Sequence, residues 1–470
     1  MTDFVGGRVA PVQDEGAGVI DKAAALAVLA APELAAWSGE RRRQALHACA
    51  DALAAAGDEV VAVAAEETGL TEARLRGELD RTTGQLRLLG DFVAAGRHRA
   101  ARVSAGAAAG GVDVVAVAVP VGPVAVFAAS NFPLAFGVAG GDTAAALAAG
   151  CPVVVKGHPA QPRTARLVAG LVAAALAGQG APEGTFALVS GGVDASLELV
   201  RAAGIRAVGF TGSLAGGRAL MDAAAARPDP IPVYAEMGSL NPVFVLPAAA
   251  GDPAWATAIA AAVTGSAGQL CTKPGLVVLP DSPAGRLLAD RIAGEVAGAD
   301  VGPRMLTERM AEAHAAWLAE AAELPGAVVD AGSGPVRPFA VRVPPETLGG
   351  ALVEEHFGPA VVLTSAPVAG YPLLAAGLAG SLTATVVGAE ADLDLARELV
   401  PLLAAVAGRI IWNGVPTGVA VCDAMHHGGP WPATSAPATT SVGTAAVSRF
   451  LRPVALQGVP DELVRAISPE

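Results

Sequence analysis

The chain has 470 residues, 53% of them hydrophobic and 16% charged, and a formal net charge of -13. A chain of this length and apolar content can bury a large core in about two or three domains, which excludes global disorder. The acidic balance argues against a general nucleic-acid-binding protein.

The first residues and the apolar runs indicate where such a protein works. The start, "MTDFVGGRVAPVQDEG", lacks the basic region and apolar core of a secretory signal. The longest apolar run, residues 114–129, contains Pro120, Gly122 and Pro123 and is too short to cross a bilayer. The four cysteines form no CxxC pair, which favours free thiols in a reducing compartment. We therefore expect a cytoplasmic protein that binds neither a membrane nor nucleic acid.

The hydrophobic period changes along the chain. Residues 20–100 carry Ala and Leu at helical spacing among clustered charges, which predicts helices. Residues 110–130 are β-branched and alternating, which predicts strands or a hairpin. From Pro123, short apolar runs alternate with helical segments, which predicts βαβ units and a parallel sheet buried on both faces. The predicted strands of this part are "PVAVFA", "CPVVVK", "TFALVS", "RAVGF" and "IPVYAE".

A second α/β section is expected over residues 241–413. Its predicted strands are "NPVFVL", "GLVVL", "AVVLTS", "TATVV" and "GRIIWN". A tail rich in Pro, Gly and Thr follows from Cys422.

Polar or small residues follow the predicted strands of the first section. Ligands of such sheets bind beside the carboxyl ends of the strands, so these residues are candidates for a binding site. They are Ser130, Asn131, Lys156, Gly157, His158, Thr211, Gly212, Ser213 and Glu236.

Two of these positions suit a nucleotide. The turn "GFTGSLAGG", residues 209–217, opens a predicted helix, whose first N–H groups favour a phosphate. The turn is not the GxGxxG fingerprint, and glycine-rich turns are common in α/β folds. Lys156 ends an apolar strand and suits a ribose or phosphate contact; the alternative is a solvated surface lysine.

Three positions suit catalysis, each with a structural alternative. Cys271, in "GSAGQLCTKPGL", is either a packed thiol or an accessible nucleophile. Glu236 is either a salt-bridged strand end or a general base. Asn131 is either a helix cap or an amide donor to an oxyanion.

Together these residues occur in a characteristic order: Asn131, Lys156, the "FTGS" turn, Glu236, Cys271 and "EEHFGP" at residues 354–359. In this order and spacing, essentially the whole chain resembles the aldehyde dehydrogenase superfamily. The stretches "ASNFPLAFG", "GQLCTKPGL" and "MHHGGPWPATS" are similar to one branch of it. That branch contains α-ketoglutaric semialdehyde (2,5-dioxovalerate) dehydrogenases and NADP-preferring fatty aldehyde dehydrogenases.

The resemblance implies an α/β fold with three parts. A Rossmann-like parallel-sheet domain for the cofactor covers residues 1–103 and 125–237, and an α/β catalytic domain covers residues 238–430. Residues 104–124 and 431–470 form a small β oligomerisation element and tail. The implied assembly is a homodimer or homotetramer.

The resemblance also implies the catalytic roles. Cys271 is the nucleophile that attacks the aldehyde carbon, and the Asn131 amide with the Cys271 N–H holds the oxyanion. Glu236 activates the water that hydrolyses the thioester. A CoA-acylating or phosphorylating variant would not need Glu236.

For the cofactor, NADP or NAD, the resemblance implies six residues. Lys156 contacts the adenosine ribose and Ser213 the pyrophosphate, while Thr211 and Gly212 lie near the nicotinamide. Glu355 holds the nicotinamide ribose with Phe357 beside it. Many NAD-specific members carry a glutamate three residues after the lysine, and this chain has Pro159 there. We therefore expect NADP to be accepted and slightly favoured, with His158 near its 2'-phosphate.

Other positions depart from the common pattern or carry weaker signals. Ser130 stands where many members have Trp, and Ser239 replaces a glycine of the common "ELGG". The adjacent pair His426 and His427 is expected to line the substrate entrance or support its loop, because no further metal ligands stand at a suitable spacing. The sequence thus predicts no metal site.

The expected reaction is NAD(P)-dependent oxidation of a small-molecule aldehyde to the acid through a cysteine thioester. The favoured substrate is 2,5-dioxopentanoate, which gives 2-oxoglutarate. The alternatives are a medium- or long-chain aliphatic aldehyde, and a catalytically inactive homologue. An arginine for the substrate carboxylate would favour the first, and Arg163 and Arg449 lie in stretches that match the branch.

Overall fold

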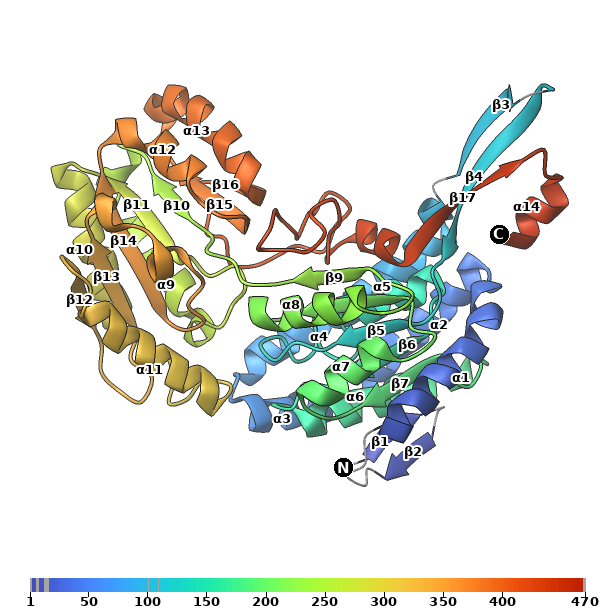
Figure 1. Cartoon of the computed structure of the whole chain (residues 1–470). Coiled ribbons are helices and arrows are strands. Elements are labelled where there is room, and N and C mark those ends of the chain that lie inside the picture. Colours follow the sequence, from blue (N-terminus) through green and yellow to red (C-terminus); the bar gives the residue numbers. More distant parts are fainter. Residues whose placement is uncertain (1, 6–7, 12–16, 100, 109, 468–470) are drawn as a thin grey trace. The chain divides into compact units, whose positions relative to one another are not determined.

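A computed structural model describes residues 2–5, 8–11, 17–99, 101–108 and 110–467 (Figure 1). The remaining positions include residues 6–7 and 12–16, so part of the region searched for a secretory signal lies outside the described residues. The chain divides into two compact units. The first unit comprises Met1–Ala235, Ala420–Met425 and Thr439–Glu470; the second comprises Glu236–Val419 and His426–Ala438.

The first unit is built on a seven-stranded sheet. Its order is β2-β1-β7-β6-β5-β8-β9, and β7, β6, β5 and β8 run parallel to one another. The N-terminal strands β1 and β2 form a hairpin whose β1 pairs antiparallel with β7. The strands are β1 (Thr2–Val5), β2 (Arg8–Pro11), β5 (Val124–Phe127), β6 (Val153–Lys156), β7 (Phe186–Val189), β8 (Ala207–Thr211) and β9 (Val233–Glu236). The five strands predicted from residue 123 onward are confirmed.

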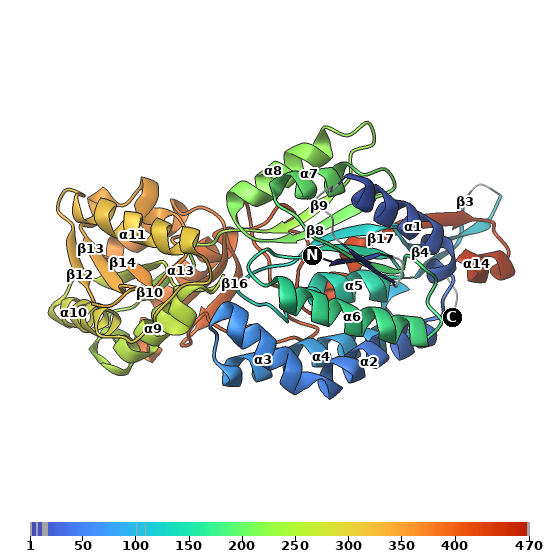
Figure 2. The ribbon, with the colours of Figure 1, turned by 90° about the horizontal axis from the view of Figure 1, so that it is seen from below.

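Helices cover both faces of this sheet, as Figure 2 shows. Alternate strand residues point to opposite faces, so Val153 and Val155 enter one apolar cluster with α2 to α6, while Val154 enters another with α1, α7 and α8. This is why the three valines of "CPVVVK" form an unbroken apolar run before Lys156. The helices are α1 (Ala17–Ala35), α2 (Gly39–Ala55), α3 (Gly57–Thr68), α4 (Glu72–Ala94), α5 (Gly141–Ala149), α6 (Pro162–Gly178), α7 (Val193–Arg201) and α8 (Leu214–Ala225).

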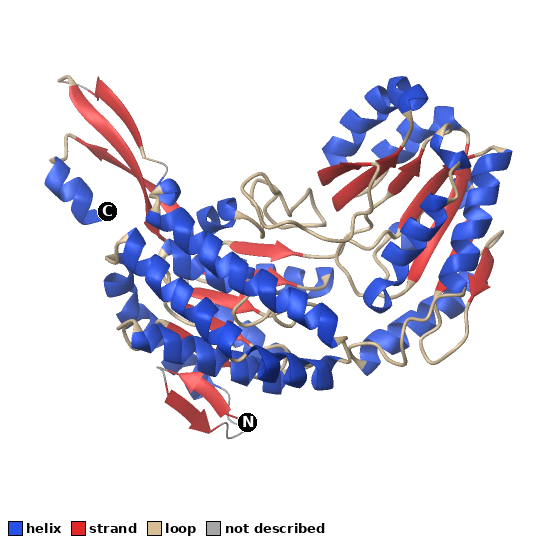
Figure 3. Ribbon diagram, turned by 180° about the vertical axis from the view of Figure 1, so that it is seen from behind, coloured by secondary structure: helices blue, strands red, loops and turns tan. Residues whose placement is uncertain are grey.

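A separate three-stranded antiparallel sheet joins two distant segments of the first unit (Figure 3). The hairpin of β3 (Arg102–Ala108) and β4 (Val112–Pro120) pairs with β17 (Leu451–Gln457) in the order β17-β4-β3. The strands predicted over residues 110–130 are therefore present. The short helices η8 (Thr444–Phe450) and α14 (Asp461–Ile467) flank β17. The use of this sheet in oligomerisation stays a prediction.

The second unit contains another seven-stranded sheet. Its order is β12-β13-β14-β11-β10-β15-β16, and all neighbours are parallel except β12 with β13. The strands are β10 (Val243–Val245), β11 (Leu276–Pro280), β12 (Val328–Ala331), β13 (Phe339–Val343), β14 (Ala360–Ala366), β15 (Ser381–Val387) and β16 (Ala407–Trp412). The sequence predicted five of these strands; it gave no separate prediction for β12 and β13.

This second sheet also has an apolar cluster on each face. One cluster packs against α9 (Ala254–Thr264) and α10 (Pro283–Ala297). The other packs against α11 (Glu308–Ala322), α12 (Tyr371–Ala376) and α13 (Leu393–Val406). Among the described helices, none has the length and apolar composition that a bilayer crossing requires.

The contacts assign the tail differently from the three parts implied by the resemblance. Residues 420–425 pack with the first unit and residues 426–438 with the second, so the chain passes between the units repeatedly. The functional division of the chain into cofactor, catalytic and oligomerisation parts stays a prediction.

Candidate active site

Cys271 follows a turn whose backbone is unusual. After α9, the short helix η3 (Gly265–Gly268) holds Ser266, Ala267 and Gly268 at φ of 54°, 54° and 67°. A left-handed conformation at Ser and Ala costs energy, and such strain is common where a turn presents a functional group. A Cβ on Gly268 would lie 2.1 Å from the Gly358 carbonyl oxygen, so glycine is required there. The turn leaves Cys271 partly exposed.

A buried asparagine holds the backbone just after this turn. The Asn241 side-chain nitrogen donates to the carbonyl oxygens of Ser239, Cys271 and Lys273 at 3.1, 2.9 and 3.0 Å. Its oxygen accepts from the Ser239 hydroxyl and from the Thr383 hydroxyl at 2.7 and 3.0 Å. Asn241 is 1% exposed and has φ of 54°, a conformation that asparagine tolerates. The amide therefore ties Cys271 to the segment that follows Glu236.

This network gives a role to Ser239, which replaces a glycine of the common pattern. Its hydroxyl donates to Asn241 and accepts the Leu382 N–H at 2.8 Å. Ser239 and Asn241 are thus physically coupled. The sequence analysis missed Asn241, because an Asn-Pro pair at the start of a strand looks like an ordinary turn.

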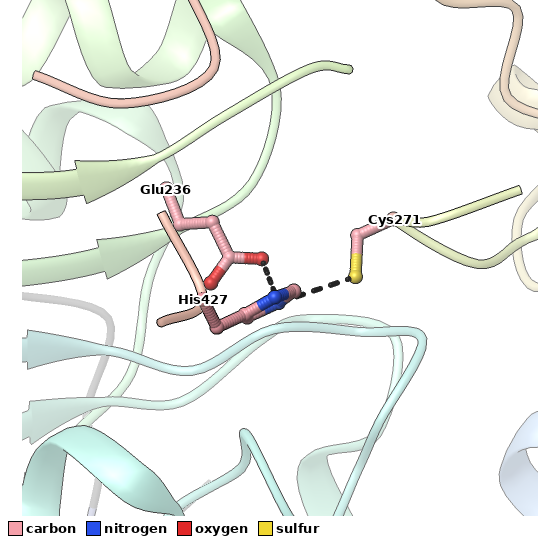
Figure 4. Close-up of side chains that lie close together, drawn as sticks. All are labelled: Glu236, Cys271 and His427. Carbon is pink, nitrogen blue, oxygen red and sulfur yellow. Dashed lines mark hydrogen bonds and ion pairs between the residues drawn. The ribbon is translucent and has the colours of Figure 1, made fainter. Parts of the chain in front are cut away.

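Three candidate site residues converge in the second unit (Figure 4). The His427 Nε2 atom lies 3.0 Å from Glu236 Oε1 and 3.7 Å from Cys271 Sγ. Glu236 is 3% exposed and His427 is 1% exposed. A short bridge between Glu236 and Thr434 brings the histidine segment alongside the end of β9. The structure therefore brings Glu236 and Cys271 together, as the resemblance implied, and adds an imidazole between them.

His427 has a more central place than the sequence suggested. The sequence analysis gave it an entrance or loop-supporting role, because its partners stand far away along the chain. With a base beside a thiol, the arrangement is that of an activated nucleophile. The neighbouring carboxylate stabilises the imidazolium that forms when Nε2 takes the thiol proton, and it can also act on a water molecule.

Glu355 and Lys273 add two charged groups near this cluster. Burial, together with the Glu236 carboxylate, raises the pKa of Glu355 to about 7, although the Ser239 N–H and Lys273 oppose this. Burial lowers the pKa of Lys273 to about 8, and its ammonium donates to the Ala360 carbonyl at 2.8 Å. A Cβ on Gly238 would lie 2.8 Å from Glu355 Oε2, so Gly238 lets this carboxyl approach. Phe357, two residues on, is partly buried.

The remaining candidates gather at one edge of the first unit's sheet. The strands β6, β5 and β8 are neighbours, and their carboxyl ends lead to Lys156, Asn131 and Thr211 respectively. Asn131 is 8% exposed, and its carbonyl accepts from Arg74 at 2.7 Å. Because Asn131 and Cys271 belong to different units, their shared oxyanion role stays a prediction.

Lys156 and His158 follow β6 at this edge. Burial lowers the pKa of Lys156. Burial, together with the Lys156 charge, lowers the pKa of His158 to about 4, so its imidazole is neutral near pH 7. The His158 Nδ1 accepts the Ala160 N–H at 3.1 Å, which leaves the proton on Nε2. His158 can therefore donate one hydrogen bond to an anion.

The glycine-rich turn opens α8 as predicted. The Ser213 hydroxyl accepts the Gly216 N–H at 3.2 Å and caps the helix. Gly212 and Ser213 are exposed. A Cβ on Gly212 would lie 2.5 Å from the Phe210 ring, so this position accepts no larger residue. The exposed turn thus offers N–H groups, and the buried Lys156 an ammonium, at an edge that fits a dinucleotide's phosphates.

Comparison with known proteins identifies the family. Residues 4–317 match the sequence profile of the Aldehyde dehydrogenase family. The chain belongs to this family. The resemblance stated from the motifs is therefore confirmed.

Two relatives of this aldehyde dehydrogenase are named for a specific aldehyde substrate. It is 45% identical over 449 residues to Alpha-ketoglutaric semialdehyde dehydrogenase 2 of Azospirillum brasilense, covering 89% of this chain and 83% of that protein. It is 42% identical over 426 residues to Alpha-ketoglutaric semialdehyde dehydrogenase of Acinetobacter baylyi, covering 87% and 80%.

Solved structures of similar fold confirm the predicted α/β architecture. A 3,6-anhydro-L-galactose dehydrogenase in complex with NAP aligns with a TM-score of 0.83 at 20% identity, over 97% of this chain and 99% of that one. A 1-pyrroline-5-carboxylate dehydrogenase from Thermus with bound NAD aligns with a TM-score of 0.83 at 21% identity, over 97% and 92%. At these identities, the comparison supports the fold of the dehydrogenase alone.

Proposed function

We propose that this aldehyde dehydrogenase oxidises 2,5-dioxopentanoate to 2-oxoglutarate with NADP or NAD as the acceptor. The observation that carries the chemistry is the contact of Cys271 Sγ with the His427 imidazole beside Glu236. The substrate is supported by the names of the two relatives at 45% and 42% identity.

The first step is attack of the Cys271 thiolate on the aldehyde carbon. His427 Nε2 accepts the thiol proton, and a C–S bond forms as the carbonyl becomes an oxyanion. The Asn131 amide and the Cys271 N–H donate to this oxygen. The bound cofactor supplies the hydride acceptor, and the carbon left on sulfur is then a thioester.

The second step is hydrolysis. Glu236 takes a proton from water, the resulting hydroxide attacks the thioester carbon, and the C–S bond breaks to release the acid and the thiolate. The carboxylate suits this role because it lies beside the sulfur without forming a covalent bond to it. A CoA-acylating reaction does not use water to cleave the thioester, so it would not need the Glu236 carboxylate.

The cofactor proposal draws on the edge of the first unit's sheet. Lys156 and the capped N-terminus of α8 supply donors for ribose and phosphate, and Glu355 and Phe357 are proposed to hold the nicotinamide end. Pro159 places no carboxylate beside a 2'-phosphate, which supports acceptance of NADP.

A cation for the substrate's carboxylate is proposed at Arg409. Both arginines considered from the sequence are engaged: Arg163 pairs with Glu66 at 2.7 Å and Arg449 with Asp142 at 2.6 Å. Arg409 on β16 is half-buried and forms no ion pair among the described residues, although it donates to the carbonyl oxygens of Gly418 and Pro416 at 3.0 and 2.7 Å. Burial lowers its pKa, and a thiolate at Cys271 opposes this lowering. A guanidinium that interacts with the sulfur suits an aldehyde that carries a carboxylate at its far end.

The three-stranded sheet supports the proposed homodimer or homotetramer, since β3 offers an edge for pairing. The four cysteines, all free, support a reducing cytoplasm.

Steady-state kinetics of the purified full-length chain test this proposal. We expect reduction of NADP or NAD with 2,5-dioxopentanoate, loss of turnover in Cys271→Ala, and in Glu236→Gln a burst of reduced cofactor followed by slow hydrolysis. Unchanged turnover in Cys271→Ala would overturn the mechanism.

The substrate assignment needs its own comparison. Arg409→Met should lower kcat/KM for 2,5-dioxopentanoate about 10- to 100-fold relative to its effect on hexanal, because one charge-assisted hydrogen bond contributes about 1.5–3 kcal/mol. Hexanal, which has no carboxylate, serves as the control substrate. Equal effects on both, or a wild-type preference for hexanal, would favour the aliphatic aldehyde alternative.

A further inference from the structure

The cluster of Glu236, Cys271 and His427 has the composition of a metal site. The carboxylate oxygen, the sulfur and the imidazole nitrogen all lie within 4.8 Å of one another (Figure 4). The nitrogen is 3.0 Å from the oxygen and 3.7 Å from the sulfur. With the bond lengths of tetrahedral zinc, ligand atoms of these kinds stand about 3.3–3.6 Å apart. The two separations from the nitrogen therefore need only small side-chain adjustments to accept the ion, and the oxygen and sulfur lie within 4.8 Å of each other.

The geometry of the cluster also suits a cation. A single atom, His427 Nε2, faces both an oxygen and a sulfur. A metal ion accepts lone pairs from all three atoms at once.

The surroundings hold these ligands in place. Asn241 fixes the Cys271 backbone through the 2.9 Å bond to its carbonyl. The backbone two residues after His427 packs tightly, since a Cβ on Gly429 would lie 2.2 Å from the Ser381 carbonyl oxygen. Glu236 and His427 are almost completely buried. A site prepared in this way loses little conformational entropy when an ion binds.

The donor set selects the metal. Thiolate, imidazole and carboxylate together suit Zn²⁺, whereas Mg²⁺ and Ca²⁺ prefer oxygen ligands. The two anionic ligands balance the charge of the ion. The nearby Arg409 cation opposes binding and keeps it reversible.

We infer that Zn²⁺ binds to Glu236, Cys271 and His427 and reversibly inactivates the enzyme. The Cys271 thiol releases its proton to solvent as the S–Zn coordinate bond forms, and no oxidation or reduction takes place. The sulfur lone pair is then held by the ion and is no longer available to the aldehyde. A chelator that removes Zn²⁺ restores the thiol. The inactivation, though not the binding, rests on the proposed function.

Binding is tested without reference to activity. The chelator-treated full-length protein is titrated with Zn²⁺ in competition with a chromophoric zinc chelator. We expect one Zn²⁺ per chain, with the dissociation constant raised at least about 10-fold in Cys271→Ala, in His427→Gln and in Glu236→Gln, because each removes one ligand. Cys422→Ser, which alters an exposed thiol of the first unit, is the matched control and should bind as the wild type does.

A second measurement needs no variant of the cluster. Zn²⁺ should slow alkylation of Cys271 by iodoacetamide at least about 10-fold, as followed by peptide mass spectrometry, and should leave the alkylation of Cys422 unchanged. Mg²⁺ at the same concentration should protect neither thiol. Wild-type affinity in all three ligand variants, or equal alkylation with and without Zn²⁺, would refute the site.

Measuring aldehyde oxidation in the presence of Zn²⁺ separates this inference from the proposed function. Zn²⁺ should abolish aldehyde oxidation at concentrations that match its binding, and excess chelator should restore the rate. Full activity at saturating Zn²⁺ would overturn the inactivation. A protein that protects Cys271 with Zn²⁺ but oxidises no aldehyde would refute the proposed function and support the metal site.

Discussion

The most informative single change is Asn241→Asp, which keeps the shape of the side chain and replaces its NH₂ with oxygen. The wild-type amide donates to three carbonyl oxygens, of Ser239, Cys271 and Lys273. In the variant these carbonyls face a carboxylate oxygen and lose their donor. The remaining side-chain oxygen still accepts hydrogen bonds from the Ser239 and Thr383 hydroxyls.

The expected cost follows from burial. Asn241 is 1% exposed, so the new charge has no access to water. An uncompensated buried charge destabilises a protein by about 3–5 kcal/mol, a large part of the roughly 5–15 kcal/mol that holds a domain folded. The free energy of unfolding should fall by that amount. The loosened Cys271 backbone should also lower kcat, since a displacement near 1 Å at a reacting group costs roughly 10²-fold.

Asn413→Asp is the matched control. Asn413 also has a positive φ, 51°, and its amide exchanges bonds with the backbone of Gly388 at 2.9 and 2.8 Å. It is exposed, so water can solvate the new carboxylate. We expect a loss of only about 0.5–1.5 kcal/mol and unchanged kinetics.

Urea unfolding and steady-state kinetics on the wild type and both variants measure these quantities. Equal destabilisation by the two substitutions would refute the reasoning from burial. A destabilised Asn241→Asp protein with wild-type kcat, measured where it is fully folded, would show that the network supports the fold without positioning Cys271.

Two further predictions concern the first unit. Because the pKa of His158 is held at about 4, its imidazole stays neutral at ordinary pH and contributes one hydrogen bond rather than a charge. His158→Ala should therefore raise KM for NADP roughly 2- to 12-fold, with no change for NAD, and this ratio should be the same at about pH 6 and about pH 8; a larger effect at the lower pH would reveal a charged imidazole. Gly209→Ala should destabilise the protein by about 1–3 kcal/mol, because the new methyl would lie 2.8 Å from the Asp142 carboxylate. Gly77→Ala, on the exposed side of α4 with no atom within 4 Å of the new methyl, should instead stabilise it by up to about 1 kcal/mol in thermal unfolding. Similar shifts in the two glycine variants would contradict the packing around Gly209.

The sequence predicts those features that depend on local pattern. Short apolar strands such as "CPVVVK" alternate with helices, and this alternation alone indicated a parallel sheet and the edge where Lys156 and Thr211 stand. The order of motifs along the chain then supplied the family, and with it Cys271 and Glu236.

The features that the sequence did not predict depend on contacts between residues far apart in the sequence. His427 meets Cys271 across 156 positions, and Asn241 bonds Thr383 across 142. No local period marks either contact. Arg449 illustrates the converse, since it lies in a stretch that matches the branch, yet the structure pairs it with a buried carboxylate.

That ion pair also bears on how the protein is made. Arg449 and Asp142 are separated by 307 positions, and the adjoining Phe450 is completely buried in the cluster that covers one face of the first sheet. During synthesis, the sheet strands of the first unit leave the ribosome long before the residues that seal this face. The whole second unit is translated in between. The nascent chain must therefore keep an unsealed apolar surface through most of elongation, which makes this unit a candidate client for chaperones that bind growing chains.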